Sequence, residues 1–150
     1  MRHFTDITDA FAVADGAVSS KIDNLLATTN MVPADVAALS QITANAYFFM
    51  VFARFESAVK ELTKQRIEQM RQHAAADDAR AWGVISHDAL FFLNHVALLT
   101  DKGGSDYRDV QELYKDRNAI AHGKFAETKP NVPVIAAKLS GILSRLEGIP

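Results

Sequence analysis

The sequence predicts an all-α fold, an irregular bundle of about five helices with one long helix among them. Apolar residues recur at three- and four-residue steps through most of the 150 residues, which is the spacing of one helix face. No stretch alternates apolar and polar residues with the period of two that is typical of strands. With 49% hydrophobic residues and no linker-like segment, residues 1–150 are expected to form one domain that can bury a core.

The composition excludes several classes of protein. The net charge of −2 gives no global field for nucleic acid or an anionic membrane, although a local basic groove stays open. The chain has no cysteine, so it has no disulfide, no thiolate metal site and no cysteine nucleophile. The longest apolar run, 44–55, is interrupted by Asn45 and Arg54 and is too short to span a bilayer. The N-terminus lacks the apolar core of a signal peptide, so we expect a soluble cytoplasmic protein without membrane contact.

Two long helical patterns fill the first half of the chain. The first runs from Phe4 to Leu26, with Gly16 as an expected break. Pro33 opens the second, because proline is favoured in a first helical turn, and nothing interrupts this pattern before about Gln72.

A helix of that length would reach roughly 60 Å at ~1.5 Å per residue. A compact domain of this size has a radius of gyration of only about 15 Å. The helix therefore either breaks near Asn45 or projects at one end and meets a partner there. We expect projection and a homodimer. Residues 1–40 form an N-terminal helical extension to which the sequence assigns no role.

Shorter helices are expected in the second half of the chain. Asp77 and Asp78 are placed to cap a short helical turn. A helix over 89–99, capped by Ser86 or Asp88, is apolar nearly all round and is therefore expected to be buried.

Two further helices complete the pattern. Ser105 is expected to cap a helix that ends at Gly123, in the usual place for a left-handed residue after a helix. Asn131 is the expected N-cap of the last helix. The apolar residues expected to face that helix into the core are Val134, Ile135, Leu139, Ile142, Leu143 and Leu146.

Polar side chains that could take part in catalysis cluster at only one place in the sequence, the end of the helix that begins near Ser105. Residues 115–124 read Lys-Asp-Arg-Asn-Ala-Ile-Ala-His-Gly-Lys and hold Arg117, Asn118 and His122 within six positions. Asn118 and His122 are four residues apart and share a helix face, whereas Arg117 and His122 lie roughly 140° apart around the helix. Gly123 allows the last turn to distort, so Arg117 and His122 can converge.

These residue types suit RNA cleavage without a metal or a cofactor. A histidine can move protons, an arginine presents a permanently charged planar fork to a pentavalent phosphate, and an asparagine can orient a neighbour. The 2′-hydroxyl attacks its own phosphate in that reaction, so no protein nucleophile is required. The sequence therefore predicts catalytic roles for Arg117, His122 and Asn118, and no metal site.

Glu56 lies inside the apolar stripe of the long helix, between Phe49 and Val59. A carboxylate in such a place must be paired, because an unpaired buried charge is destabilising. We expect Arg117 to be its partner. An exposed Glu56 paired with Lys60, one turn further along the helix, is the alternative.

The string Arg-Asn-Ala-Ile-Ala-His-Gly, residues 117–123, resembles the signature of HEPN domains, in the branch whose motif ends in Ile-Ala-His-Gly. Residues 52–59, Phe-Ala-Arg-Phe-Glu-Ser-Ala-Val, resemble the long helix of the family, which bears an internal glutamate. The resemblance covers about residues 44–125. It implies an all-helical, HEPN-like domain of a kind found in RNA-cleaving toxins, defence proteins and RNA-processing factors.

By this resemblance Arg117 and His122 take the catalytic positions, Asn118 the supporting polar position and Glu56 the position on the opposing helix. It also implies a homodimer in which two motifs line one cleft, an RNA substrate, and an antitoxin protein as a partner if the chain is a toxin. Other HEPN domains are non-catalytic and serve as dimerisation or nucleotide-binding scaffolds. That second function stays open, as does a plain helix end with Arg117 paired to Asp116.

Basic residues of the long helix could follow an RNA backbone. Lys60, Lys64 and Arg71 share one face, and Lys124 follows the motif. The face also carries interleaved acidic residues, so an ordinary solvated face is the alternative.

The remaining candidates have structural alternatives. His87 and His95 flank an apolar helix, but no third ligand follows at metal spacing, and His95 is expected to be a satisfied core histidine. Tyr114, one turn before Asn118, either borders the site or packs in the core. The aromatic residues expected in the core and on a dimer surface are Tyr47, Phe48, Phe49, Phe52 and Phe55.

Overall fold

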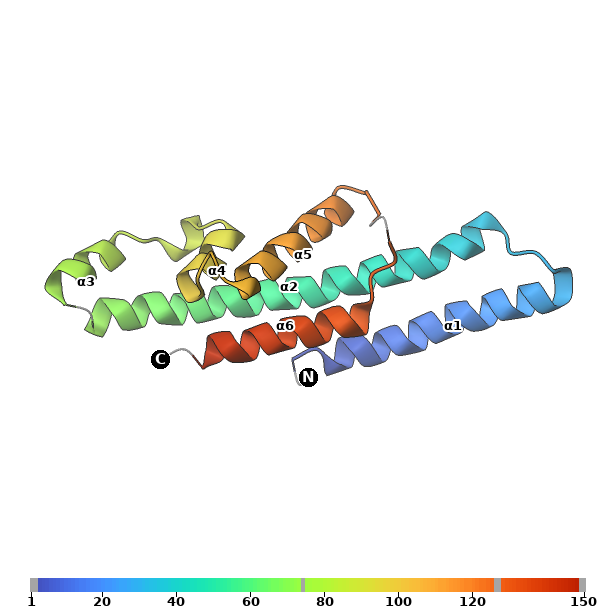
Figure 1. Cartoon of the computed structure of the whole chain (residues 1–150), viewed down its shortest axis with the longest axis horizontal. Helices are drawn as coiled ribbons and strands as arrows, with labels where there is room; N and C mark the ends of the chain where they lie inside the picture. The colour runs from blue at the N-terminus through green and yellow to red at the C-terminus, as the bar shows by residue number, and fades with distance from the viewer. Residues whose placement is uncertain (1–2, 74, 126–127, 149–150) are drawn as a thin grey trace.

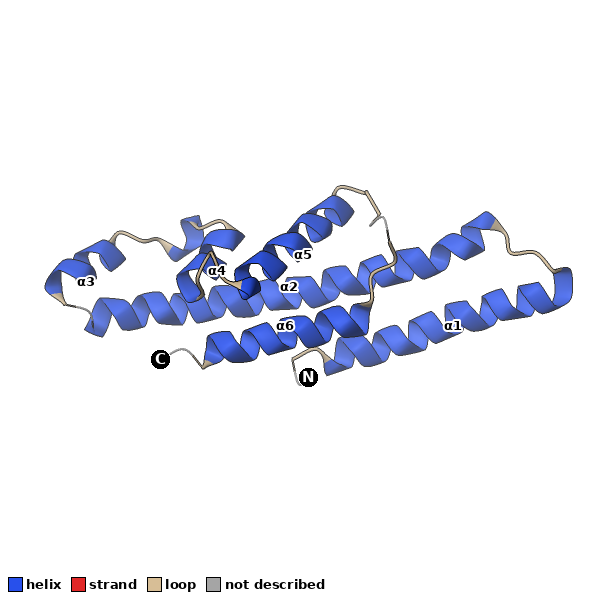
Figure 2. Cartoon of the chain, viewed as in Figure 1, coloured by secondary structure: helices blue, strands red, loops and turns tan. Residues whose placement is uncertain are grey.

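The computed structural model of the chain describes residues 3–73, 75–125 and 128–148, apart from the side chains of residues 76 and 77. Within them the helices are α1 (Thr5–Thr29), α2 (Ala34–His73), α3 (Ala76–Gly83), α4 (Phe92–Leu99), α5 (Ser105–Ala121) and α6 (Val132–Glu147). A 3₁₀ turn, η1 (His87–Ala89), lies between α3 and α4. All regular secondary structure in the described residues is helical (Figure 2). The prediction of an all-α irregular bundle is confirmed, with six α-helices in place of about five.

The axis of the molecule is α2, a continuous helix of 40 residues. It reaches roughly 60 Å at ~1.5 Å per residue. Every other helix is arranged along it (Figure 1): α1 runs beside its N-terminal half, α6 beside its middle, and α4 and α5 on the side opposite α6 in this view. The predicted long helix is therefore present, and the alternative break near Asn45 does not occur.

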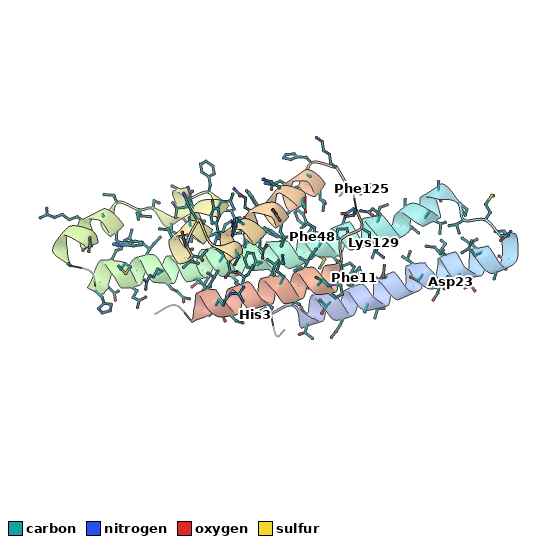
Figure 3. All side chains as sticks on the ribbon, in the orientation of Figure 1. His3, Phe11, Asp23, Phe48, Phe125 and Lys129 are labelled. Atoms are coloured by element: carbon teal, nitrogen blue, oxygen red, sulfur yellow. The ribbon has the colours of Figure 1, made fainter. Side chains whose placement is uncertain are left out.

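The core lies around the middle of α2. Phe48, Phe52 and Phe55 are fully buried, and the ring of Phe52 lies 5.6 Å from that of Phe92 on α4, centroid to centroid. The start of α1 also belongs to the core (Figure 3, where Phe11 and Phe48 are labelled). The core residues of α1 and its N-cap are Phe4, Ile7 and Phe11. The N-terminal segment is thus part of the domain core at its beginning.

The remainder of α1 projects. Together with the first turns of α2, it extends past the ends of α5 and α6 as a hairpin of two helices (Figure 1). The expected break at Gly16 is wrong, because α1 runs through it from Thr5 to Thr29. A single glycine weakens a helix by about 1 kcal/mol relative to alanine, which the packing of α1 on α2 offsets.

The capping predictions had mixed outcomes. Asn131 caps α6 as predicted, with its Oδ1 accepting a hydrogen bond from the Val134 backbone N–H at 3.2 Å. The N-cap of α5 is Gly104 and not Ser105. The loop before it explains the difference: the Gly104 N–H donates to the Asp101 carbonyl at 2.9 Å, and this turn starts the helix one residue earlier.

Three further details differ from the sequence-based expectation. α4 starts at Phe92, after η1, so the helix expected from Ala89 is shorter and has no side-chain cap. The residue that precedes α3 is Ala75, so Asp78 lies inside that helix, and the side chain of Asp77 lies outside the described residues. Val134 is 59% exposed, because it lies in the first turn of α6.

One described helix, α2, is long and apolar enough to cross a membrane by length and composition alone. Its most apolar 18-residue window has a mean hydropathy of 1.5, and 33% of that window is buried inside the fold. The core helix of a bundle can pass the same test, so the absence of membrane contact stays a prediction. The cytoplasmic location stays a prediction.

Candidate functional site

Arg117 is the centre of a polar cluster between α5 and α2. Its guanidinium Cζ lies 4.8 Å from the ring centroid of Phe49, and its Nη2 lies 3.4 Å from Oε2 of Glu56. Its Nη1 donates to the side-chain Oδ1 of its neighbour Asn118 at 3.1 Å. The side chain is 24% exposed. Its plane and direction are fixed by an aromatic face, a carboxylate and an amide.

Glu56 links this arginine to a lysine. One carboxylate oxygen faces Arg117, and the other accepts a hydrogen bond from Nζ of Lys60 at 2.8 Å. The side chain is 17% exposed. Glu56 is therefore paired with Arg117 as predicted and also with Lys60, one on each oxygen, but it is not in the exposed position that the alternative assumed. We call Phe49, Glu56, Lys60, Arg117 and Asn118 the Arg117 cluster.

His122 lies outside the Arg117 cluster. It is the C-cap of α5 and is exposed, and no side-chain hydrogen bond or ion pair joins it to another described residue. Asn118 could have oriented the imidazole, but its Oδ1 instead accepts a hydrogen bond from Nη1 of Arg117. The structure thus brings Arg117, Asn118 and Glu56 together and leaves His122 free on the surface, at the end of the same helix.

The backbone after His122 explains this position. Gly123 adopts φ +78°, its N–H donates to the Ile120 carbonyl at 2.9 Å, and the Lys124 N–H donates to the Ala119 carbonyl at 2.9 Å. This is the Schellman pattern that ends a helix with a left-handed glycine. The predicted end of the helix at Gly123 is confirmed. The turn carries the chain away from α5 and leaves the His122 ring in solvent.

Tyr114 is half-buried and packs against the core. Its ring centroid lies 5.1 Å from that of Phe92 and 6.1 Å from that of Phe52. The predicted packing of Tyr114 is therefore observed, and a place at the border of the site stays a prediction.

The basic residues of α2 line a separate cleft of about 710 Å³ between α2 and the segment around η1. Lys60, Lys64 and Arg71 contribute to it, but so do Glu61, Glu68 and Asp88. Arg71 is also occupied, because Nη2 donates to the Ile85 carbonyl at 2.8 Å. The cleft therefore has no excess positive charge. Lys124 is exposed near His122 and does not line it.

His87 and His95 contact each other edge to face, with ring centroids 5.0 Å apart. His95 is 2% exposed, and its Nδ1 has no hydrogen-bond partner among the described residues, so the expectation of a satisfied core histidine is only half right. Burial lowers the pKa of His95, and the neighbouring His87 and Lys60 lower this pKa further. Among the described residues no group of three His, Cys, Asp or Glu is arranged to hold a metal.

The role of Phe49 is the part of the site that sequence reasoning missed. The sequence predicts Phe49 in the core and on a dimer surface, whereas its ring lies under the guanidinium of Arg117. A signal existed, because Phe49 precedes Glu56 by seven residues and so shares its helix face. Once Glu56 is paired with Arg117, Phe49, two turns earlier on that face, lies within reach of the same guanidinium.

Comparison of the chain with protein-family models, curated proteins and solved structures finds no match in any of the three.

Proposed function

We propose that this chain is a metal-independent endoribonuclease of HEPN type that cleaves RNA by attack of a 2′-hydroxyl on the adjacent phosphate. In this proposal His122 is the general acid and base, Arg117 stabilises the phosphorane, and Asn118 positions Arg117. The observation that supports it best is the arginine held by Glu56, Asn118 and Phe49 on the helix that ends at an exposed histidine. The setting proposed, from the resemblance, is a toxin or defence effector in the cytoplasm with an antitoxin protein as partner.

The reaction needs two proton transfers. A base takes the proton of the 2′-hydroxyl as its oxygen bonds to phosphorus, and an acid protonates the 5′-oxygen as the bond from phosphorus to that oxygen breaks. The products are a 2′,3′-cyclic phosphate and a 5′-hydroxyl. His122 can perform one of these transfers, and a homodimer with two motifs in one cleft would supply a histidine for the other.

Arg117 must partly exchange partners to act. Its Nη2 lies 3.4 Å from the Glu56 carboxylate and its Nη1 3.1 Å from the Asn118 amide oxygen, so an incoming phosphate has to replace one of these two acceptors. An RNA phosphate carries the same kind of oxygen acceptor as the Glu56 carboxylate and can replace it there. Glu56 would then remain paired with Lys60. In this scheme Glu56 orients the guanidinium of Arg117 before RNA binds.

A second candidate is a non-catalytic HEPN-like scaffold that dimerises or binds a nucleotide. Two observations favour it: Arg117 is already engaged on both Nη atoms, and no described interaction holds His122 near it. The two proposals differ in one measurable respect, which is whether folded chain cleaves RNA.

The deciding experiment is cleavage of a mixed RNA pool in EDTA by the wild type, Arg117→Ala and His122→Ala. His73→Ala is the matched control, because His73 is also exposed at the C-terminal end of a helix. We expect the first two substitutions to lower the rate by about 100-fold or more and the control to leave it unchanged. End-group analysis should find 2′,3′-cyclic phosphates.

Two results would contradict the nuclease. Intact RNA after incubation with folded wild type favours the scaffold, and equal cleavage by wild type and His122→Ala points to a contaminating nuclease. Growth arrest on expression, relieved by His122→Ala and not by His73→Ala, is the corresponding test in cells.

A further inference from the structure

Two of the nine phenylalanines of the chain, Phe91 and Phe125, are exposed. Phe125 is 57% exposed and Phe91 81%, whereas the other seven are buried or half-buried. Phe125 belongs neither to the core nor to the partly buried side chains that pack against it. An exposed ring contributes little to the stability of the fold, because most of its apolar surface stays in water. What surrounds the two exposed rings distinguishes them.

Phe125 lies close to the proposed general acid and base. It follows His122 by three residues, so their Cα atoms are at most about 11 Å apart. The turn that ends α5 fixes the backbone between them, because the N–H groups of Gly123 and Lys124 each donate to a carbonyl of the last turn of α5 at 2.9 Å. Figure 3 shows Phe125 beside the end of α5, on the segment that leads toward α6. The exposed ring is therefore held near the histidine.

The end of α5 is basic, although the chain as a whole is not. Residues 115–125 include Lys115, Arg117 and Lys124 and a single acidic residue, Asp116, whereas the whole chain has a net charge of −2. Lys115 and Lys124 are exposed. Cations beside an aromatic ring are the combination by which proteins hold a single strand of nucleic acid, because the cations pair with phosphates and the ring stacks on a base.

Phe91 lacks these basic neighbours. It precedes α4 at the end of a segment, residues 84–91, that contains no lysine or arginine. The segment does contain Asp88, whose carboxylate would repel a phosphate. Phe91 is therefore a ring of the same kind, at least as exposed, in a setting that does not suit RNA.

We propose that Phe125 is a base-stacking residue, and that the site takes single-stranded RNA with an unpaired base near the cut phosphate. The inference rests on the proposed function for the position of the cut. Arg117 and His122 act on that phosphate, Lys124 pairs with a neighbouring phosphate, and the ring of Phe125 stacks on a neighbouring base. A reach of about 11 Å corresponds to roughly three nucleotides at ~3.4 Å per stacked nucleotide, so the base lies within about three nucleotides of the cut.

A ring that stacks on a base selects unpaired RNA. Both faces of a base inside a duplex are already covered by its neighbours, so a double-stranded segment has no free face for Phe125. Stacking tolerates any sequence, because every base has a π-face. We therefore expect loops and single strands to bind through the ring, and duplexes to bind through their phosphates alone.

A second copy of the chain is the other kind of partner that an exposed ring can contact. A ring in a protein interface stabilises it most when further contacts around the ring exclude water. The described residues nearest to Phe125 in the sequence, His122, Gly123, Lys124 and Thr128, are all exposed and offer no apolar side chain. The surroundings of the ring therefore favour a nucleic acid, and pairing of two copies through the ring is an outcome that the test can detect.

The test is binding of a short fluorescent single-stranded RNA in which every 2′-hydroxyl is methylated, measured by fluorescence anisotropy at one salt concentration. A methylated 2′-oxygen has no proton to lose and cannot attack the phosphate, so binding is measured without cleavage. Phe125→Leu should raise the dissociation constant at least about fivefold, because one stacked base is lost. Phe125→Trp should bind at least as tightly as the wild type. Phe91→Leu is the matched control and should bind like the wild type.

Two further measurements separate stacking from a general loss of affinity. The same RNA annealed to its complement should bind equally to the wild type and to Phe125→Leu, since its bases are already stacked. In cleavage of unmodified RNA, Phe125→Leu should raise KM and leave kcat within about twofold, because the stacking contact is equally strong before and during the reaction. Circular dichroism verifies that every variant remains helical.

Four results would overturn the inference. They are equal affinity of the wild type and Phe125→Leu, an equal loss of affinity in Phe91→Leu, and no binding of the methylated RNA by folded wild type. The fourth is a Phe125→Leu chain that loses affinity and also has a lower mass than the wild type in analytical ultracentrifugation, because the ring would then lie between two copies.

The outcomes for the stacking site and for the nuclease are distinguishable. A wild type that binds the methylated RNA through Phe125 but leaves unmodified RNA intact would refute the nuclease and support the stacking site. Cleavage with the same KM in the wild type and Phe125→Leu would do the reverse.

Discussion

At the scale of single residues, the polar contacts at Glu56 explain how a carboxylate is kept inside an apolar helix face. Each of its oxygens has a cationic donor, Lys60 on its own helix and Arg117 on α5. Charge-assisted hydrogen bonds of this kind are about twice as strong as neutral ones. The cluster therefore fixes α5 on α2 as well as orienting Arg117.

Glu56→Gln should weaken the attachment of α5 to α2 and the orientation of the Arg117 side chain. The amide keeps the size of the side chain but can accept at only one oxygen, so we expect the free energy of unfolding to fall by about 1–2 kcal/mol. Urea unfolding followed by circular dichroism measures it. Glu61→Gln is the control, because Glu61 is exposed one turn further along α2. Equal effects of the two substitutions would show that the contact with Arg117 contributes nothing to stability.

His95 should make the stability depend on pH. Burial, together with His87 and Lys60, lowers its pKa below the ordinary value of 6.5, while a backbone hydrogen bond with Leu90 and the charge of Glu56 act in the other direction. As the pH falls below about 6.5, the unfolded chain takes up a proton that the folded chain does not, so the free energy of unfolding falls by up to about 1.4 kcal/mol per pH unit. Unfolding in urea at pH 7.5 and 5.5 measures this loss.

His95→Phe should remove most of that loss, because phenylalanine has a similar ring and no proton to bind. His73→Phe, at an exposed position, should leave the loss in place. A wild type with the same stability at both pH values would contradict the assignment.

At the scale of helices, two glycines that look alike in the sequence have opposite roles. Gly16 lies inside α1 with no atom within 4 Å of an added Cβ, whereas Gly123 has φ +78° after α5. The first is an interior helix position where alanine is favoured, and the second is a left-handed position where alanine is strained.

Gly16→Ala should therefore raise the free energy of unfolding by about 0.5–1 kcal/mol, and Gly123→Ala should lower it by about 1 kcal/mol. Each substitution is the control of the other, since both add the same methyl group. Thermal unfolding of the two variants gives the comparison. A gain in stability from Gly123→Ala would mean that the left-handed turn after His122 is not required.

At the scale of the whole molecule, the stability should vary along α2. The part from Phe48 to Val59 is buried among α4, α5 and α6, whereas residues 34–43 bury only Val36. Amides open locally where few side chains are buried. Hydrogen exchange should therefore be faster over 34–43 than over 48–59, although both belong to one continuous helix.

Hydrogen exchange of the wild-type chain followed by mass spectrometry measures this gradient. Uniform protection along α2 would contradict the description of residues 34–43 as weakly held.

The sequence by itself determined the helical class, the length of α2, the cap at Asn131 and the end of α5 at Gly123. These features depend on contacts between residues a few positions apart, such as helical spacing and the left-handed glycine. The partner of Glu56 could also be proposed, because a carboxylate within an apolar stripe requires one.

Tertiary structure alone decided the rest. Whether Glu56 faces Arg117 or Lys60 depends on the rotation of α2 against α5, and the answer, one oxygen to each, is not encoded in either helix separately. The same holds for Phe49 under the guanidinium, and for His122, which the turn at Gly123 leaves apart from the Arg117 cluster. Gly16 remained helical because α1 packs along α2, and packing between distant segments outweighs a local preference of about 1 kcal/mol.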